Sequence, residues 1–327
     1  MKAIQLEQYG GPEVLQVVQL EKPVARKKDV LIKIEAIGVN YADTARREGQ
    51  YVIPTPLPFV PGAEVAGEVV EIGDEVEGIE VGTKVVTLIG SKRSTGYAEY
   101  TLADSRGLIR LPKGMDMQQA VSLPLQGLSA YHILKTMGQL QAGETVLVHA
   151  AAGGVGTIAV QLAKLFGAGK VIATASTEEK LALARSLGAD ETVNYTEENW
   201  SEQVMDLTDG RGADVVLEMA GGAVFYESLN VLAPFGRIIL YGNASGEQVR
   251  INPARLMAKN QTISGFFLPQ IMEKPKLFQQ SLQELLGYVS EGRLKVIIGG
   301  TFKLDEAADV HRMLQDRKTS GKLILLP

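Results

Sequence analysis

The middle of the chain alternates between short apolar runs and segments with apolar residues at helical spacing. Residues 145–150 and 170–175 are apolar and rich in β-branched side chains, which is typical of strands buried on both faces. Between them, residues 158–166 carry apolar side chains at helical spacing, and Gly167 and Gly169 end that pattern. The pattern therefore predicts a strand, a helix and a second strand in succession.

The same alternation continues to residue 267. It predicts helices over 178–187 and 198–208, a further helix that ends at Leu232, and strands over 191–195, 213–220, 236–242 and 262–267. Six strands joined by right-handed helical crossovers make a Rossmann-type, doubly wound parallel sheet of the α/β class. Ligands bind outside the carboxyl ends of such strands, so we expect Met219, Gly242 and Phe266 to face a cofactor crevice.

Both ends of the chain show a different pattern. Short alternating runs separated by Gly and Asp turns, at 29–39, 62–73, 82–90 and 98–103, predict a mainly antiparallel, partly closed β domain. The tail predicts a helix over 275–290, a strand over 295–302, a helix over 305–316 and a last strand over 322–327, which we expect to fold back onto the first domain. The predicted domains are residues 1–122, 123–266 and 267–327, the first and last forming one domain.

The turn after the first strand of the sheet is rich in glycine. Residues 151–156 fit G-x-G-x-x-G with alanine in the first glycine's place. Gly153 would let the backbone approach a pyrophosphate, and Gly156 would let the helix pack closely on the strand. We therefore expect dinucleotide phosphates at the helix N-terminus, against the alternative of a tight turn without a ligand. The predicted contacts are Ala152, Gly153, Gly154, Val155 and Gly156.

The end of the second strand indicates which dinucleotide binds. NAD-specific proteins usually place Asp or Glu about 20 residues after the glycines, where this chain has Ser176. Ser176 can donate to a 2′-phosphate, Lys180 can supply charge, and Tyr195 ends the third strand beside them. The cofactor predicted is NADPH. In the alternative, Glu178 and Glu179 bind the ribose and Lys180 is a solvated helix residue.

Composition excludes several classes of protein. The 327 residues are 45% hydrophobic and 22% charged, as in ordinary soluble proteins. The net charge of −5 gives no electrostatic reason to expect nucleic acid as the main partner. The chain contains no cysteine, so disulfides and thiolate metal sites are impossible. No segment predicts a signal peptide or membrane span, and we expect a cytoplasmic protein.

Several longer motifs then identify a family. Residues 10–15, 36–51, 58–73, 149–156 and 241–246 read GGPEVL, AIGVNYADTARREGQY, PFVPGAEVAGEVVEIG, HAAAGGVG and YGNASG. With these, the whole chain resembles the zinc-independent NADPH:quinone oxidoreductases, the zeta-crystallin-like group of the medium-chain dehydrogenase/reductase superfamily. The resemblance implies a GroES-like catalytic domain around an inserted Rossmann domain, reduction of quinones or other electron-poor alkenes, and a homodimer paired through residues 261–267.

The resemblance also implies site residues. It places Asn40, Asp43 and Tyr51 around the substrate cleft and Ser129 close to the nicotinamide; alternatively, Asn40 only caps a turn and Tyr51 only covers the domain edge. For the cofactor it implies Gly242, Asn243, Phe266, Phe267, Leu268 and Lys322. Alternatively, Phe266 and Phe267 are ordinary packing between the domains, and Lys322 is a solvated lysine.

Metal chemistry is not expected. The zinc-dependent relatives have a histidine between glycine and glutamate, where this chain has Ala63 between Gly62 and Glu64. A zinc site needs three or four converging ligands, and the chain has three histidines in separate segments. Without a Lewis acid, hydride transfer suits an acceptor polarised by its own carbonyl, such as a quinone.

Two other functions stay open at this point. One is the NADPH-dependent reduction of α,β-unsaturated aldehydes or ketones. The other is an NADPH-binding protein with a structural or RNA-interaction role, although the acidic charge balance and the lack of a basic tract argue against RNA.

Overall fold

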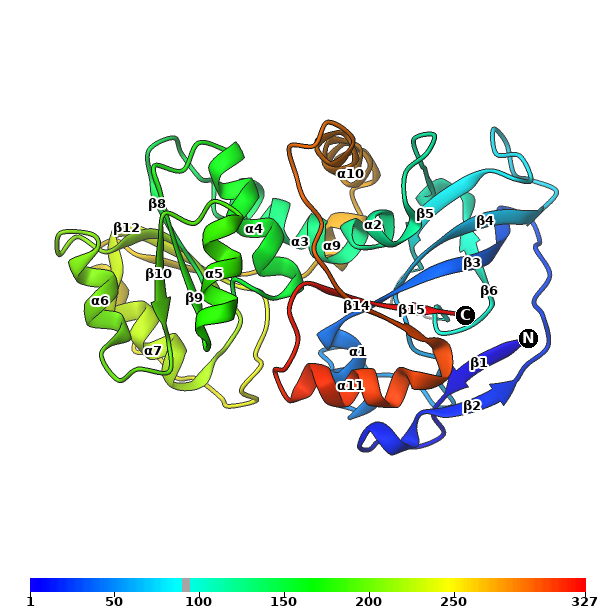
Figure 1. Ribbon diagram of the computed structural model, residues 1–327, viewed down its shortest axis with the longest axis horizontal. Helices are drawn as coiled ribbons and strands as arrows, with labels where there is room; N and C mark the ends of the chain where they lie inside the picture. The colour runs from blue at the N-terminus through cyan, green and yellow to red at the C-terminus, as the bar shows by residue number, and fades with distance from the viewer. Residues whose placement is uncertain (90–94) are drawn as a thin grey trace. The chain divides into compact units, whose positions relative to one another are not determined.

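The structure is a computed structural model that describes residues 1–89 and 95–327 (Figure 1). The chain forms two compact units, one of Met1–Leu125 with Pro269–Pro327 and the other of Gln126–Leu268. The predicted strand 82–90 and the loop 91–97, which we expect to help shape the substrate pocket, extend into residues 90–94, outside the described residues.

The second unit contains a fully parallel sheet of six strands. The strand order is β10-β9-β8-β11-β12-β13. This order reverses direction beside β8, as in a doubly wound fold, so the predicted Rossmann class is confirmed. The strands are β8 (Thr145–Val148), β9 (Lys170–Ala175), β10 (Glu191–Asn194), β11 (Ala213–Glu218), β12 (Leu232–Leu240) and β13 (Thr262–Gly265).

Helices cover both faces of this sheet (Figure 1). Helices α4 and α5 pack on one face, and α6 and α7 pack on the other, where Trp200 and Phe225 contribute to a buried cluster with Leu147 and Ile172 of the strands. The helices of this unit are α3 (Leu128–His132), α4 (Gly154–Leu165), α5 (Glu178–Ser186), α6 (Trp200–Asp206), α7 (Gly222–Asn230) and α8 (Ala254–Met257), with a π-helical turn at Ile133–Met137.

One predicted boundary in this unit is wrong. The helix expected to end at Leu232 ends at Asn230, and Leu232 opens β12. Leu232 pairs with Ala213, and the register then shifts so that Arg237 pairs with Val215. The irregularity around Pro234, which has no backbone N–H to donate, hid the first part of a long strand from the sequence pattern.

The first unit is built around β3, an 11-residue strand that pairs with three others. Its sheet has the order β14-β15-β3-β4-β5-β7, and β6 also pairs with β3; all pairs except β14–β15 are antiparallel. The C-terminal tail therefore returns to the N-terminal sheet, as expected. The strands are β3 (Asp29–Val39), β4 (Glu64–Ile72), β5 (Lys84–Leu88), β6 (Tyr100–Asp104), β7 (Ile109–Arg110), β14 (Ile298–Lys303) and β15 (Lys322–Leu326), with a separate pair β1 (Lys2–Gln5) and β2 (Gln16–Gln19).

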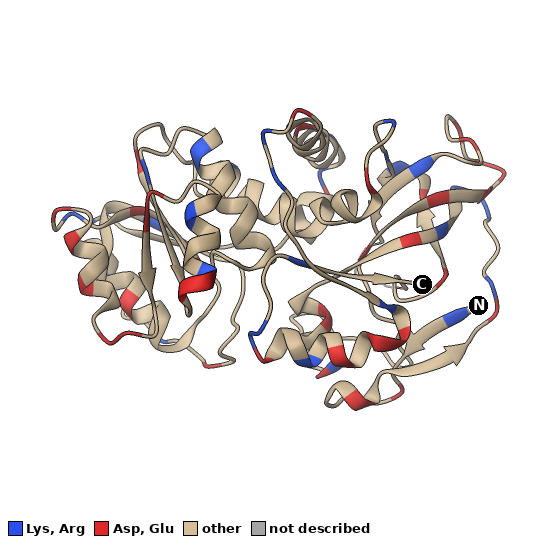
Figure 2. Cartoon of the chain, viewed as in Figure 1, with Lys and Arg blue, Asp and Glu red and all other residues tan. Residues whose placement is uncertain are grey.

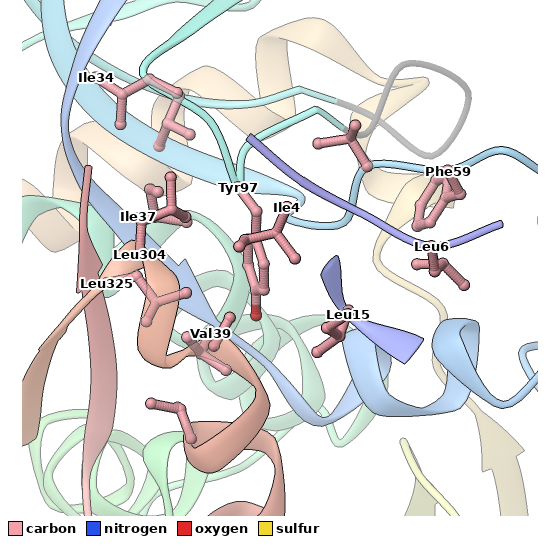
Figure 3. Close-up of a cluster of buried hydrophobic side chains, with 14 of the residues drawn as sticks. Ile4, Leu6, Leu15, Ile34, Ile37, Val39, Phe59, Tyr97, Leu304 and Leu325 are labelled. Atoms are coloured by element: carbon pink, nitrogen blue, oxygen red, sulfur yellow. The ribbon is translucent and has the colours of Figure 1, made fainter. Parts of the chain in front are cut away.

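Helices of both chain ends complete this unit. They are α1 (Tyr41–Arg47), α2 (Met117–Val121), α9 (Pro269–Met272), α10 (Pro275–Ser290) and α11 (Ala307–Gln315), with short 3₁₀ turns at Pro12–Val14, Ser105–Gly107 and Leu304–Glu306 and a π-helical turn that begins at Leu123. Figure 3 shows the main core, with Ile4 beside the ring of Tyr97, Ile37 and Leu325 on one side of it, and Phe59 next to Leu6 on the other. Tyr97 is fully buried there with its polar hydroxyl, which therefore needs a hydrogen-bond partner.

Charged residues of both signs are interspersed over the elements of each unit (Figure 2). In the part of the chain that the structure describes, no helix is long and apolar enough to cross a membrane.

Candidate active site

The glycine-rich turn has the geometry that its sequence predicts. Ala150 takes a left-handed φ of 48°, and Gly153 caps α4, whose first residue is Gly154. A side-chain carbon on Gly156 would lie 2.3 Å from the carbonyl oxygen of Ala150, so only glycine allows α4 to start this close to β8. First-turn N–H groups have no partner within their helix, and the turn therefore fits the pyrophosphate of a dinucleotide.

The residues predicted at a 2′-phosphate lie together at the ends of β9 and β10. Ser176 directly follows β9, and the backbone N–H of Tyr195 donates to the Ala175 carbonyl at 3.2 Å. Lys180 is in the first turn of α5, where its N–H donates to the capping hydroxyl of Thr177 at 3.4 Å. The carboxylate of Glu178, the alternative ribose ligand, forms a salt bridge with Arg185. Figure 2 shows acidic and basic residues along the same helix, α5.

The remaining predicted cofactor residues of this unit follow β12 and β13. Asn243 directly follows Gly242, and its side-chain oxygen accepts a hydrogen bond from the Ser245 hydroxyl at 3.2 Å. The N–H of Phe266 donates to Leu240 at 2.7 Å and extends the ladder beyond β13; Phe267 and Leu268 follow it.

Ser129 is buried in α3, in the same unit. Three residues further on, the ring of His132 stacks against Phe266 with centroids 6.5 Å apart. The Phe266 ring therefore contacts a residue of its own unit, whereas the packing alternative had placed it between the domains.

Sequence reasoning missed Glu218 at the carboxyl end of β11. This fully buried carboxylate accepts from the N–H groups of Ala220 and Gly221 at 2.8 and 3.0 Å, and burial raises its pKa. An acidic residue at the carboxyl end of a strand whose four central residues include the apolar run 215–217 was the signal available in the sequence.

In the first unit, Asn40 lies in a buried cluster with Glu64 and Lys322. The Asn40 amide donates to Glu64 at 2.7 Å and accepts from the Lys322 ammonium at 2.9 Å. Lys322 also forms a salt bridge with Glu64, which accepts from the N–H of Leu125 at 2.8 Å. Burial lowers the pKa of Lys322. Lys322 is therefore a buried, paired residue and not a solvated one.

Asp43 belongs to the same cluster. It is fully buried in α1, and its Oδ2 accepts from the backbone N–H of Asn40 at 2.9 Å, which caps the helix. Burial raises the pKa of Asp43 to about 6. Asn40 and Asp43 thus form a capping box at the start of α1, and the Asn40 side chain also belongs to the cluster.

Tyr51 belongs to the same unit and is half-buried. The Arg46 guanidinium lies over its ring, 4.3 Å from the centroid, and also reaches Thr55 at 3.5 Å. Burial raises the pKa of Tyr51, so its phenol stays a hydrogen-bond donor at neutral pH.

Two features of the sequence point to the buried cluster. Glu64 and Lys322 each open an apolar strand, and a charge at the start of a buried strand needs a partner. The described residues contain no group of three or more His, Asp or Glu side chains arranged to hold a metal.

The fold and these sites define a two-domain dehydrogenase of the medium-chain class. Family models described as "Alcohol dehydrogenase GroES-like domain" and "Zinc-binding dehydrogenase" match residues 26–113 and 154–286. The quinone oxidoreductase of Pseudomonas aeruginosa is 38% identical over 327 residues, which is 100% of this chain and 99% of that protein.

Solved structures agree with this assignment. The Pseudomonas syringae quinone oxidoreductase is 37% identical, with a TM-score of 0.93 over 100% of this chain and 99% of its own. The Escherichia coli quinone oxidoreductase complexed with NADPH is 31% identical, with a TM-score of 0.95 over 100% of both chains. The chain belongs to the quinone oxidoreductase family of the medium-chain dehydrogenase/reductase superfamily.

Proposed function

We propose that the protein is an NADPH-dependent oxidoreductase that reduces quinones by hydride transfer without a metal. The observation that carries this proposal is the full-length likeness to quinone oxidoreductases, one of them solved with NADPH. In the reaction, a quinone, NADPH and a proton give a hydroquinone and NADP⁺. NADPH, when bound, supplies the hydride.

The second unit supplies the cofactor site in this proposal. The backbone from Ala152 to Gly156 holds the pyrophosphate, and Ser176, Lys180 and Tyr195 hold the 2′-phosphate, since no carboxylate ends β9. Ser129, Gly242, Asn243 and residues 266–268 contact the nicotinamide half.

The first unit supplies the residues predicted for the acceptor. Tyr51 is the one whose phenol can donate to the acceptor carbonyl as negative charge develops on its oxygen. Asn40 and Asp43 are buried, so we propose that they shape and hold the site. We propose the same for Lys322, in place of the cofactor contact expected from the sequence.

The remaining predictions belong to the same proposal. The domain borders expected at 122/123 and 266/267 lie close to the ends of the compact units at Leu125 and Leu268. We further propose a cytoplasmic homodimer that pairs through β13. Among the described residues, β13 pairs with one strand, β12, and therefore forms an edge of the sheet at which a second copy could pair.

A panel of acceptors tests the proposal. NADPH oxidation is followed with a quinone, a short enone and a short enal, before and after exhaustive chelation with metal content determined in parallel. We expect quinone turnover to be fastest and to survive chelation. Faster turnover of the enone or enal would favour the alternative reductase, zinc-dependent activity would refute the metal-free assignment, and silence with every acceptor would favour a binding role.

A further inference from the structure

A chain of buried polar contacts connects Asp43 to a second helix of the first unit. The hydroxyl of Tyr97 lies 3.4 Å from Asp43 Oδ2 and 3.0 Å from His311 Nε2, and His311 Nδ1 lies 3.2 Å from Arg47 Nη1. All four side chains are at most 1% exposed. Arg47 also donates to the Gly10 carbonyl at 2.9 Å.

Arg47 fixes the direction of this chain. A guanidinium only donates hydrogen bonds and does not lose its proton in proteins, so His311 Nδ1 must accept. Burial, and then the charge of Arg47, lower the pKa of His311 to about 3, which keeps the ring neutral. A neutral imidazole that accepts at Nδ1 carries its hydrogen on Nε2, and that hydrogen points at the oxygen of Tyr97. The Tyr97 hydrogen is then free to point at Asp43.

The two oxygens of Asp43 therefore differ. Oδ2 faces two donors, the Tyr97 hydroxyl and the backbone N–H of Asn40. Oδ1 is buried and has no hydrogen-bond partner within residues 1–89 and 95–327. A proton on Oδ2 would oppose two donated hydrogens, whereas a proton on Oδ1 opposes none.

We propose that Arg47, His311 and Tyr97 are positioning residues that keep Asp43 Oδ2 an acceptor and direct any proton that Asp43 takes up to Oδ1. Oδ2 holds the start of α1 at Asn40, whose amide contacts Lys322 and Glu64, so the chain fixes one end of the acceptor site. The link to catalysis rests on the proposed function; the hydrogen-bond direction does not.

Several charged groups act on Asp43 besides this chain. Lys322 from β15 and Arg46 from α1 favour its ionised form, and Glu64 from β4 disfavours it; burial is the largest influence and raises the pKa to about 6. Among the neutral titratable groups, Tyr97 and Tyr51 also sense the Asp43 charge.

The first test is the tautomer of His311, read from its ring-nitrogen NMR shifts in the whole protein. The chain contains three histidines, and His311→Gln assigns the signal by its loss. We expect a neutral ring with its hydrogen on Nε2 from pH 8 down to about pH 5. A hydrogen on Nδ1, or a charged ring at pH 6, would overturn the proposal.

The second test is the titration of the Asp43 carboxyl carbon, assigned with Asp43→Asn. Tyr97→Phe removes a donor to the carboxylate, so the pKa should rise by about one unit, a tenfold gain in proton affinity. In His311→Gln, the glutamine side-chain amide can still accept from Arg47 and donate to Tyr97, so the pKa of Asp43 should not change. Tyr100→Phe, a tyrosine on β6, is the matched control. An unchanged pKa in Tyr97→Phe would overturn the proposal.

The pH profile of quinone turnover tests the link to catalysis separately from the hydrogen-bond direction at Asp43. The profile should follow Asp43 and move upward with Tyr97→Phe by the same unit. An unchanged pH profile in Tyr97→Phe would overturn the link to catalysis. If no quinone is reduced at any pH, the proposed function fails, while the two NMR tests still decide the positioning role.

Discussion

At the residue scale, we propose that Lys180 makes the protein prefer NADPH to NADH. It lies in the first turn of α5, beside the end of β9 that lacks a carboxylate. A charge-assisted phosphate contact contributes about 1.5–3 kcal/mol, so Lys180→Ala should weaken NADPH binding about tenfold or more and leave NADH binding nearly unchanged. Fluorescence titration of both cofactors measures this. Lys164→Ala, on α4 of the same unit, is the control, and an equal loss for both cofactors would contradict the assignment.

Single residues also show where the sequence was informative. The glycines at 153 and 156, the missing acid at 176 and the missing histidine at 63 could be read directly, because each depends on local backbone or on a residue type. The partners of Asn40 and Asp43 could not be predicted in this way. Lys322 lies 282 residues from Asn40 and His311 lies 264 residues from Arg47, and only the return of the tail brings them to the start and the end of α1.

At the element scale, a buried ion pair joins β4 to β15. Lys322→Met leaves the Glu64 carboxylate buried without its cation, which should lower the free energy of unfolding by about 3–5 kcal/mol. Adding Glu64→Gln to Lys322→Met should restore most of the loss, because a neutral amide can still accept from Leu125. Urea unfolding gives both values.

Lys318→Met is the control for that series, because its ammonium pairs with Asp316 at the surface and should change the stability by less than about 0.5 kcal/mol. If Lys322→Met also changed the free energy of unfolding by less than about 0.5 kcal/mol, the buried ion pair would not stabilise the sheet.

The parallel sheet ends at β13, which is the strand that we propose for dimer pairing. Gly265 is exposed there, and an added side-chain carbon would meet no atom within 4 Å, so Gly265→Lys should fold normally. Charge on an edge strand opposes pairing, so this variant should sediment as a monomer at micromolar concentration, where wild type and Gly265→Ala should be dimers. A monomeric wild type would overturn the proposed assembly.

The elements could be predicted well where the pattern is regular. All six parallel strands could be predicted from the alternation of strands and helices. The central strands β8 and β9 are clearest, because strands buried on both faces are nearly continuous apolar runs. The start of β12 was missed where a proline and a register shift break the run. The pairing of β15 between β14 and β3 is a long-range choice that local patterns do not contain.

At the scale of the whole molecule, family and fold agree along the entire chain, and the chemistry proposed for it depends on one cofactor. The measurement that tests this most directly is the steady-state reduction of one quinone with NADPH and with NADH in parallel. We expect turnover only when both a quinone and NADPH or NADH are present. We expect the kcat/KM for NADPH to be at least about tenfold above that for NADH, since only NADPH can gain the charged 2′-phosphate contact. No quinone-dependent oxidation of NADPH, or a kcat/KM for NADH equal to or above that for NADPH, would contradict the proposed chemistry.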